Sequence, residues 1–307
     1  MILSVSRRTD IPAFYSDWFY NRVKEGFVCV RNPMNIHQIS KIPINPDIVD
    51  CIVFWTKNPN AMMARLNEID EFNYYFQFTI NPYNRSIESF VPKKEFVIDT
   101  FKRLADKIGA NRVIWRYDPI LISNEIDINY HIKYFETLAK RLSSYTKKCV
   151  ISFIDNYKKT ERNVQAIAAR ELDNNEIQSL SKALVEISKT YNIEIQSCAE
   201  KYDLENIEIK HGKCIDNELI EQITGFAIET KKDRSQRKEC GCIESIDIGE
   251  YNTCRHNCLY CYANYNHTEV QKKVERHIQT SPLLIGDVTP IDIIIDRKCC
   301  SLKKKIV

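Results

Sequence analysis

Six short runs of apolar, β-branched and aromatic residues recur along the first two hundred residues. They cover residues 2–6, 51–55, 74–80, 112–116, 149–154 and 193–198. Each run is almost continuously apolar rather than alternating, which is typical of parallel strands buried on both faces. Segments with helical periodicity separate the runs, at residues 17–24, 60–69, 93–108, 130–142 and 161–190, the last with an expected break at 173–175.

This alternation predicts an α/β fold built from βαβ units around a parallel sheet. Six units fit a partial (β/α)6 TIM-like barrel, and a complete eight-stranded barrel is the alternative if residues 283–285 and 291–295 add strands. We expect the barrel core over residues 1–200. A C-terminal cysteine-rich segment over residues 201–307, with a helix at 215–223 and a charged connector at 231–238, would then pack on the mouth of the barrel.

Composition narrows the class of protein. The chain has 307 residues, 44% hydrophobic and 28% charged, which is ordinary for a globular protein, and its net charge of +3 is too small to indicate nucleic-acid binding. Its apolar runs are too short to span a bilayer and its start lacks a signal-peptide pattern, so we expect a cytoplasmic protein without a membrane partner. Twelve cysteines in that compartment favour metal binding over disulfides.

Three of these cysteines lie close together near the C-terminus. Cys254, Cys258 and Cys261 have the spacing C-x3-C-x2-C. Thiolates this close can converge on one metal centre, and on a four-iron cluster they would leave one iron open to a small molecule. Two alternatives remain: an apolar stripe on a helix, and a zinc site completed by His256 or His267.

This spacing resembles the signature of the radical S-adenosylmethionine (SAM) enzymes, with Tyr260 as the aromatic residue before the last cysteine. Over most of its length the chain also resembles an uncharacterised bacterial family, the DUF1848 family, whose members end in a similar cysteine cluster. The residues that carry this second resemblance are 6–12, 54–59, 115–119 and 247–264.

The radical SAM resemblance implies that the three cysteines hold a [4Fe–4S] cluster that binds SAM and cleaves it reductively, starting radical chemistry on an anionic small molecule or peptide. It also implies that Tyr260 lies along the adenine of SAM and that a ferredoxin or flavodoxin donates the electron. In those enzymes the cysteine loop follows the first strand and a Gly-Gly-Glu segment holds SAM. Here the loop follows the sixth strand and that segment is absent, so we expect a permuted order, with the loop folded back over the barrel mouth.

Polar side chains follow several of the predicted strands. Functional sites in barrels and open α/β sheets form at the carboxyl ends of strands. Residues at these strand ends are candidates for catalysis, and the cationic ones could bind a carboxylate or a phosphate. For each residue the alternative is a structural role, as a helix or turn cap or as part of an ion pair. The catalytic candidates are Arg7, Arg8, Asp10, Lys57, Arg116 and Asp118, and the cofactor-binding candidates are Tyr260, Lys57, Arg116 and Glu200.

Four more cysteines precede the C-x3-C-x2-C motif: Cys198, Cys214, Cys240 and Cys242. Four thiolates suffice for a second [4Fe–4S] cluster or a closed zinc site, and buried unreactive cysteine is the alternative. The sequence therefore favours a radical SAM-like iron–sulfur enzyme. The competing interpretation is a non-catalytic protein whose zinc or iron–sulfur site serves structure or electron transfer.

Overall fold

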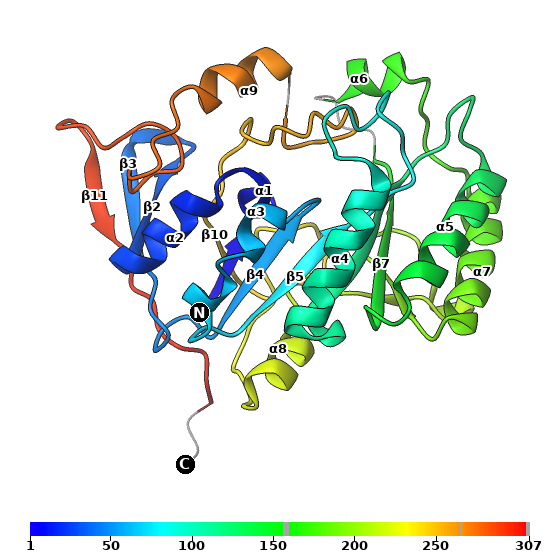
Figure 1. The fold of residues 1–307 in the computed structure, drawn as a ribbon, viewed down its shortest axis with the longest axis horizontal. Coiled ribbons are helices and arrows are strands. Elements are labelled where there is room, and N and C mark those ends of the chain that lie inside the picture. The colour runs from blue at the N-terminus through cyan, green and yellow to red at the C-terminus, as the bar shows by residue number, and fades with distance from the viewer. Residues whose placement is uncertain (156–159, 265, 305–307) are drawn as a thin grey trace.

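The computed structural model describes residues 1–155, 160–264 and 266–304, and its centre is an open sheet of eight parallel strands (Figure 1). All six predicted runs form strands of this sheet, so the predicted α/β fold with a parallel sheet is confirmed. The order across the sheet is β10 (Ile246–Asp247), β1 (Ile2–Val5), β4 (Cys51–Thr56), β5 (Tyr74–Thr79), β6 (Val113–Ile120), β7 (Lys148–Phe153), β8 (Glu194–Ser197) and β9 (Lys210–His211).

The sheet does not close on itself. Its two edge strands, β10 and β9, do not pair with each other in the described part of the chain. Both edge strands come from the predicted C-terminal segment after residue 200, whereas the six inner strands come from the first two hundred residues. None of the described helices is long and apolar enough to cross a bilayer.

Helices fall close to the predicted positions. The expected break at 173–175 is confirmed, because Asp173 caps a new helix: its carboxylate accepts the Glu176 N–H at 2.9 Å, and the Glu176 carboxylate accepts the Asp173 N–H at 2.9 Å. The helices are α1 (Ile11–Phe14), α2 (Ser16–Glu25), α3 (Asn60–Met63), α4 (Lys94–Ile108), α5 (Ile128–Leu142), α6 (Glu161–Ala166), α7 (Asn174–Thr190), α8 (Asn217–Thr224) and α9 (His267–Val274). Short 3-10 turns cover Leu66–Ile69, Ala110–Arg112 and Glu205–Ile207.

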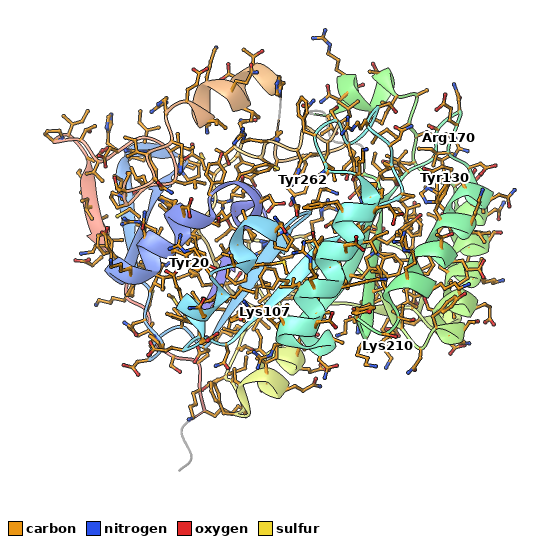
Figure 2. All side chains as sticks on the ribbon, in the orientation of Figure 1. Tyr20, Lys107, Tyr130, Arg170, Lys210 and Tyr262 are labelled. Atoms are coloured by element: carbon orange, nitrogen blue, oxygen red, sulfur yellow. The ribbon has the colours of Figure 1, made fainter. Side chains whose placement is uncertain are left out.

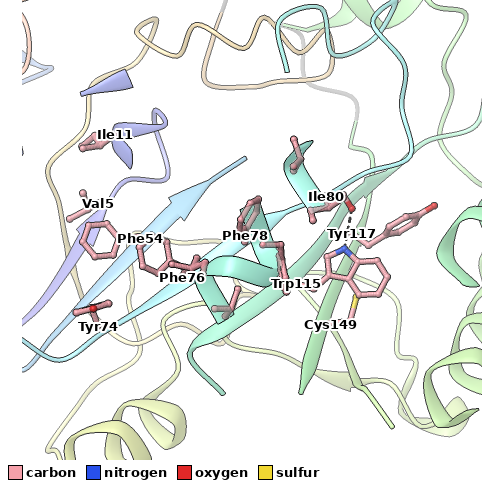
Figure 3. Close-up of a cluster of buried hydrophobic side chains, with 14 of the residues drawn as sticks. Val5, Ile11, Phe54, Tyr74, Phe76, Phe78, Ile80, Trp115, Tyr117 and Cys149 are labelled. Carbon is pink, nitrogen blue, oxygen red and sulfur yellow. Dashed lines mark hydrogen bonds between the residues drawn. The ribbon is translucent and has the colours of Figure 1, made fainter. Parts of the chain in front are cut away.

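The two faces of the sheet have different covers, because successive side chains of a strand point to opposite faces. On one face aromatic rings form a row (Figure 3) that packs against α2, α4, α5 and α7: Phe54 stacks on Phe76 at 4.7 Å, and Trp115 stacks on Phe135 of α5 at 4.9 Å. On the other face the intervening side chains, such as Val53, pack against α8 and the cysteine-rich loops. Each face therefore has its own apolar core.

A second, three-stranded sheet was not predicted. It has the order β11 (Ile293–Asp296), β3 (Asn35–Pro43) and β2 (Phe27–Asn32). Because β11 pairs with β3, and residues 283–285 form no strand, the expectation that these C-terminal segments complete an eight-stranded barrel is wrong.

Helix α4 offers a matched test of this packing. Phe101 is fully buried and its ring lies 5.0 Å from that of Phe78, whereas Phe96 on the same helix is 42% exposed. Phe101→Ala should lower the free energy of unfolding by about 3–5 kcal/mol, and Phe96→Ala by less than about 1 kcal/mol, in urea titrations. Equal losses in the two variants would contradict the assignment of the buried face of α4.

Candidate functional site

A cavity of about 460 Å³ opens at the carboxyl ends of the central strands. The chain that follows β10, gold in Figure 1, passes over this edge of the sheet, and Tyr262, labelled in Figure 2, lies there. The cavity wall contains His256 and the catalytic, cofactor-binding and cysteine candidates that the sequence singled out: Arg7, Arg8, Asp10, Lys57, Arg116, Asp118, Glu200, Tyr260, Cys198, Cys214, Cys240, Cys242, Cys254, Cys258 and Cys261.

The loop that carries Cys254, Cys258 and Cys261 is irregular, so the alternative of a helical apolar stripe is wrong. Asn257 turns the chain with a φ of 52°, a left-handed conformation that asparagine tolerates better than most residues. The amide of Asn264 donates to the carbonyl of Cys254 at 2.7 Å, and the Cys261 N–H donates to the carbonyl of Cys258 at 3.1 Å. Local hydrogen bonds therefore hold the three thiols on one wall of the cavity.

Burial raises the pKa of all three thiols, that of Cys258 to about 12 even though Lys57 nearby lowers it. The thiols are therefore neutral at physiological pH. A metal or cluster bound to them would have to displace their protons, so its affinity would fall as the pH falls.

The carboxylate of Asp10 ties this loop to two strand ends. It accepts the Ala13 N–H at 3.0 Å, the Lys57 N–H at 2.7 Å and a hydrogen bond with His256 Nε2 at 2.8 Å. His256 Nδ1 is buried and has no hydrogen-bond partner in the described part of the chain, and the same holds for Thr9 Oγ1. Both residues lie in or beside the cavity wall, so a group that fills the cavity could satisfy them.

The donor atoms around the cavity determine which metal centre it suits. Within residues 1–155, 160–264 and 266–304, no group of three or more His, Cys, Asp or Glu side chains could hold a metal ion as the side chains stand. The donor chemistry nevertheless suits an iron–sulfur cluster, since three soft thiols share one cavity with two unsatisfied polar atoms. His267, by contrast, is exposed and does not line the cavity.

A buried ionic network lies beside the three thiols, and the sequence did not reveal it. Glu88 accepts from Lys57 Nζ at 2.8 Å, Lys94 Nζ at 2.5 Å and the Tyr260 hydroxyl at 2.5 Å, while Asn81 Nδ2 donates to the Tyr260 oxygen at 3.1 Å. Neither Glu88 nor Lys94 follows a predicted strand, so the pattern of polar strand ends does not point to them. Tyr260, predicted to lie along an adenine, is held against the wall by this hydroxyl contact.

The charges of this network are mutually compensated. Burial alone would raise the pKa of Glu88, but Lys57 and Lys94 lower it to about 2. Burial also works to lower the pKa of Lys57, yet Glu88 raises it above its ordinary value, so the ammonium stays charged. The pKa of Lys94 is lowered because burial outweighs the attraction of Glu88.

Arg116 and Asp118 form a second buried group at the end of β6. The Arg116 guanidinium is bound to the Asp118 carboxylate, which also accepts a hydrogen bond from the Ser152 hydroxyl. Arg116 Nη1 also donates to Cys214 Sγ at 2.7 Å. The arginine is thus committed to protein partners on two sides.

Contacts with Asp247 of the edge strand β10 hold the segment of Arg7 and Arg8 in place. Asp247 accepts from the Ser6 hydroxyl at 2.6 Å and from the Arg7 N–H at 2.8 Å. A side chain at Gly249 would put its Cβ only 2.0 Å from Ser6 Oγ, so only glycine fits this crossing. Arg8 has long contacts, 3.5 Å to the Gly249 carbonyl and 3.9 Å to Asp247, and its side chain is 31% exposed.

Glu200, predicted to bind a cofactor, lies at the end of β8 and is buried. Its carboxylate accepts the Phe153 N–H at 2.8 Å. Burial raises its pKa to about 8, with Asp155 and Asp118 contributing in the same direction. At neutral pH this side chain is therefore largely a neutral acid that can donate a proton or a hydrogen bond into the cavity.

Comparison with known proteins assigns the family. The model of the family described as "Domain of unknown function (DUF1848)" matches residues 2–263, which include all seven cavity cysteines, so the chain belongs to this family. No protein of curated function matches it significantly. Among solved structures it is similar to a candidate α-L-fucosidase from Bacteroides thetaiotaomicron VPI-5482, at 10% identity and a TM-score of 0.21 over 57% of this chain and 71% of that one. That likeness is too slight to inform either fold or activity.

The Glu88 network makes a prediction about acid stability. A carboxyl whose folded pKa is about 2, below its ordinary 4.5, stabilises the native state above pH 4.5, and this contribution is lost as the pH falls toward 2. Glu88→Gln leaves the half-buried ammonium groups of Lys57 and Lys94 without their buried carboxylate, so it should destabilise the protein at pH 7 by up to about 3 kcal/mol and flatten the acid limb of its stability curve.

The measurement is urea unfolding of wild type and variant from pH 7 to pH 3. Glu95→Gln, which removes an exposed partner of Arg141, is the control and should change both quantities far less. If Glu88→Gln keeps the stability of wild type and its acid dependence, the ionic network does not form in solution.

Proposed function

We propose that this DUF1848 protein is a radical SAM-type iron–sulfur enzyme in which Cys254, Cys258 and Cys261 hold a [4Fe–4S] cluster. The observation that carries the proposal is their position: buried Cys258 and half-buried Cys254 and Cys261 line one cavity of about 460 Å³ at the carboxyl ends of a parallel sheet. A cluster held by three thiolates offers one iron to SAM and, when reduced, supplies the electron that cleaves it.

The sheet suits this role as an incomplete barrel. We interpret β1 and β4 to β8 as the six strands of a partial (β/α)6 core, with the cysteine loop entering after the last of them in permuted order. Asp10 and His256 orient that loop, and the aromatic core on the helix face keeps water from the sheet below the cavity.

Among the cavity cations, Arg8 is best placed to bind an anion. Lys57 and Arg116 were also expected to do so, but their charged groups already contact Glu88 and Asp118. The guanidinium of Arg8 lies over the ring of Tyr251, 5.2 Å from its centroid, and its polar contacts are the long ones described above. A carboxylate of SAM or of substrate could displace these polar contacts at little cost. We expect an anionic small molecule or peptide as substrate, a ferredoxin or flavodoxin as electron donor, and the cytoplasm as compartment.

One observation favours a second candidate, a zinc protein without catalysis. His256 Nδ1 is buried, unpartnered in the described part of the chain and carried by the same loop as the three thiols, so three cysteines and this histidine could surround one zinc ion. The metal content of the protein separates the two candidates.

Protein purified without oxygen should be brown and contain about four iron and four sulfide per chain, because one cubane has that composition. Replacing Cys254, Cys258 and Cys261 together with alanine should abolish both. The measurement is elemental analysis with sulfide determination, and Cys300→Ser, at an exposed cysteine, serves as control. A colourless wild type that loses zinc on the triple replacement would instead support the zinc candidate.

Cluster-loaded protein should bind SAM, and Arg8→Ala should weaken SAM or substrate-anion binding by ten- to a hundredfold. Loss of one charge-assisted hydrogen bond costs about 1.5–3 kcal/mol, which corresponds to that factor. Calorimetric titration of wild type, Arg8→Ala and the control Arg103→Ala, whose guanidinium contacts Asn60 outside the cavity, measures the effect. No affinity of the loaded wild type for SAM would refute the SAM assignment, and unchanged binding by Arg8→Ala would exclude Arg8 as the anion site.

A further inference from the structure

We propose that Cys198, Cys214, Cys240 and Cys242 bind a single zinc ion as a tetrahedral four-thiolate site. This site is separate from the cysteine loop at 254–261 and does not depend on the proposed function. The sequence left open whether these four cysteines hold a second iron–sulfur cluster, a zinc ion or nothing, and their arrangement in the structure favours one of these outcomes.

The four thiols line one cavity. Cys198 Sγ lies 3.1 Å from Cys214 Sγ, and the Ile215 N–H beside Cys214 donates to Cys242 Sγ at 3.4 Å. They come from three separate places in the sequence: the end of β8, the segment after β9 and the loop before β10. Such convergence of four soft ligands, in contrast to Cys29, Cys51 and Cys149, which are buried singly, indicates a metal site more strongly than accidental burial.

Short sulfur-to-sulfur distances favour one ion over a cluster. With zinc–sulfur bonds of about 2.3 Å, the sulfurs of a tetrahedral site lie about 3.8 Å apart, so the Cys198 and Cys214 sulfurs need to separate by only about 0.7 Å. In a cubane each thiolate binds a different iron at its own corner, and the four sulfurs lie much farther apart. The thiols as they stand hydrogen-bond to one another and could not yet hold a metal.

The backbone that carries these cysteines is already fixed. The carbonyl of Cys214 accepts from the Tyr75 hydroxyl at 2.6 Å and from Gln77 Nε2 at 3.0 Å, both from β5. The loop of Cys240 and Cys242 approaches so closely that a Cβ at Gly241 would lie 3.2 Å from the Gly212 carbonyl oxygen. Little chain entropy remains to be lost on binding an ion.

The surroundings also suit the charge of such a site. Four thiolates and one zinc ion carry two net negative charges, which burial would penalise without cations nearby. Arg116 Nη1 lies 2.7 Å from Cys214 Sγ. Arg7 lines the same cavity as the four cysteines and brings a second positive charge near them. Hydrogen bonds to the ligands, such as that from Arg116, support metal sites.

The test is metal analysis of the full chain expressed with zinc and iron both present. Wild type and the alanine variant of Cys254, Cys258 and Cys261 should each retain about one zinc per chain at this site, since one tetrahedral site takes one ion. Cys240→Ser combined with Cys242→Ser should lose it, and Cys300→Ser should not. Cobalt added to metal-free wild type should give the visible absorption of a tetrahedral thiolate complex, a result that does not require any variant to fold.

Three results would overturn the proposal. The alanine variant at 254, 258 and 261 could contain iron and sulfide in place of zinc, which would mean a second cluster. It could contain no metal, which would leave four structural thiols. The Cys240 and Cys242 double variant could keep its zinc, which would place the ion elsewhere. A wild type with zinc and no iron would refute the proposed cluster while leaving this site intact, provided that one zinc survives replacement of the other three cysteines.

Discussion

The cavity depends on one carboxylate, that of Asp10. It caps α1, receives the Lys57 N–H from the end of β4 and holds His256 in the cysteine loop, so three segments separated by up to 246 positions meet at a single side chain. The contact with His256 is buried and the other two are partly buried, and an unsatisfied buried donor costs about 1–3 kcal/mol. The position of the thiols over the sheet therefore follows from the first turn after β1.

The two faces of the sheet are covered by different elements. Helices with long apolar stripes cover one face and supply an aromatic core, whereas the other face packs against α8 and loops rich in cysteine. The cavity lies where these two layers meet at the strand ends, and there buried charge replaces apolar contact. Glu88, Asp118 and Asp247 each have cations or several donors, which explains how so many ionised groups remain buried together.

Much of this arrangement could be read from the sequence because it rests on local signals. Continuous apolar runs located β1 and β4 to β8, and the rule that sites form at strand ends brought Arg7, Lys57 and Arg116 to one edge. The signals for β2 and β3 were weaker, since these strands carry mixed apolar and polar side chains. A possible strand was indicated at 291–295, where β11 forms, but its pairing with β3, Ile293 opposite Gln38, joins segments far apart in the sequence. Glu88 and Lys94 meet their partners through tertiary packing, which no spacing in the sequence encodes.

The edge strand β10 has a consequence for how the protein is made. Ser6 and Arg7 are synthesised well before the Asp247 carboxylate that binds them, which follows 241 and 240 residues later in the chain. Until then β1 has an unpaired edge and the cavity lacks one wall together with the 254–261 thiols. Any metal insertion at all three thiols must therefore follow synthesis of Cys261, and a product truncated before β10 would leave this edge of the sheet unpaired.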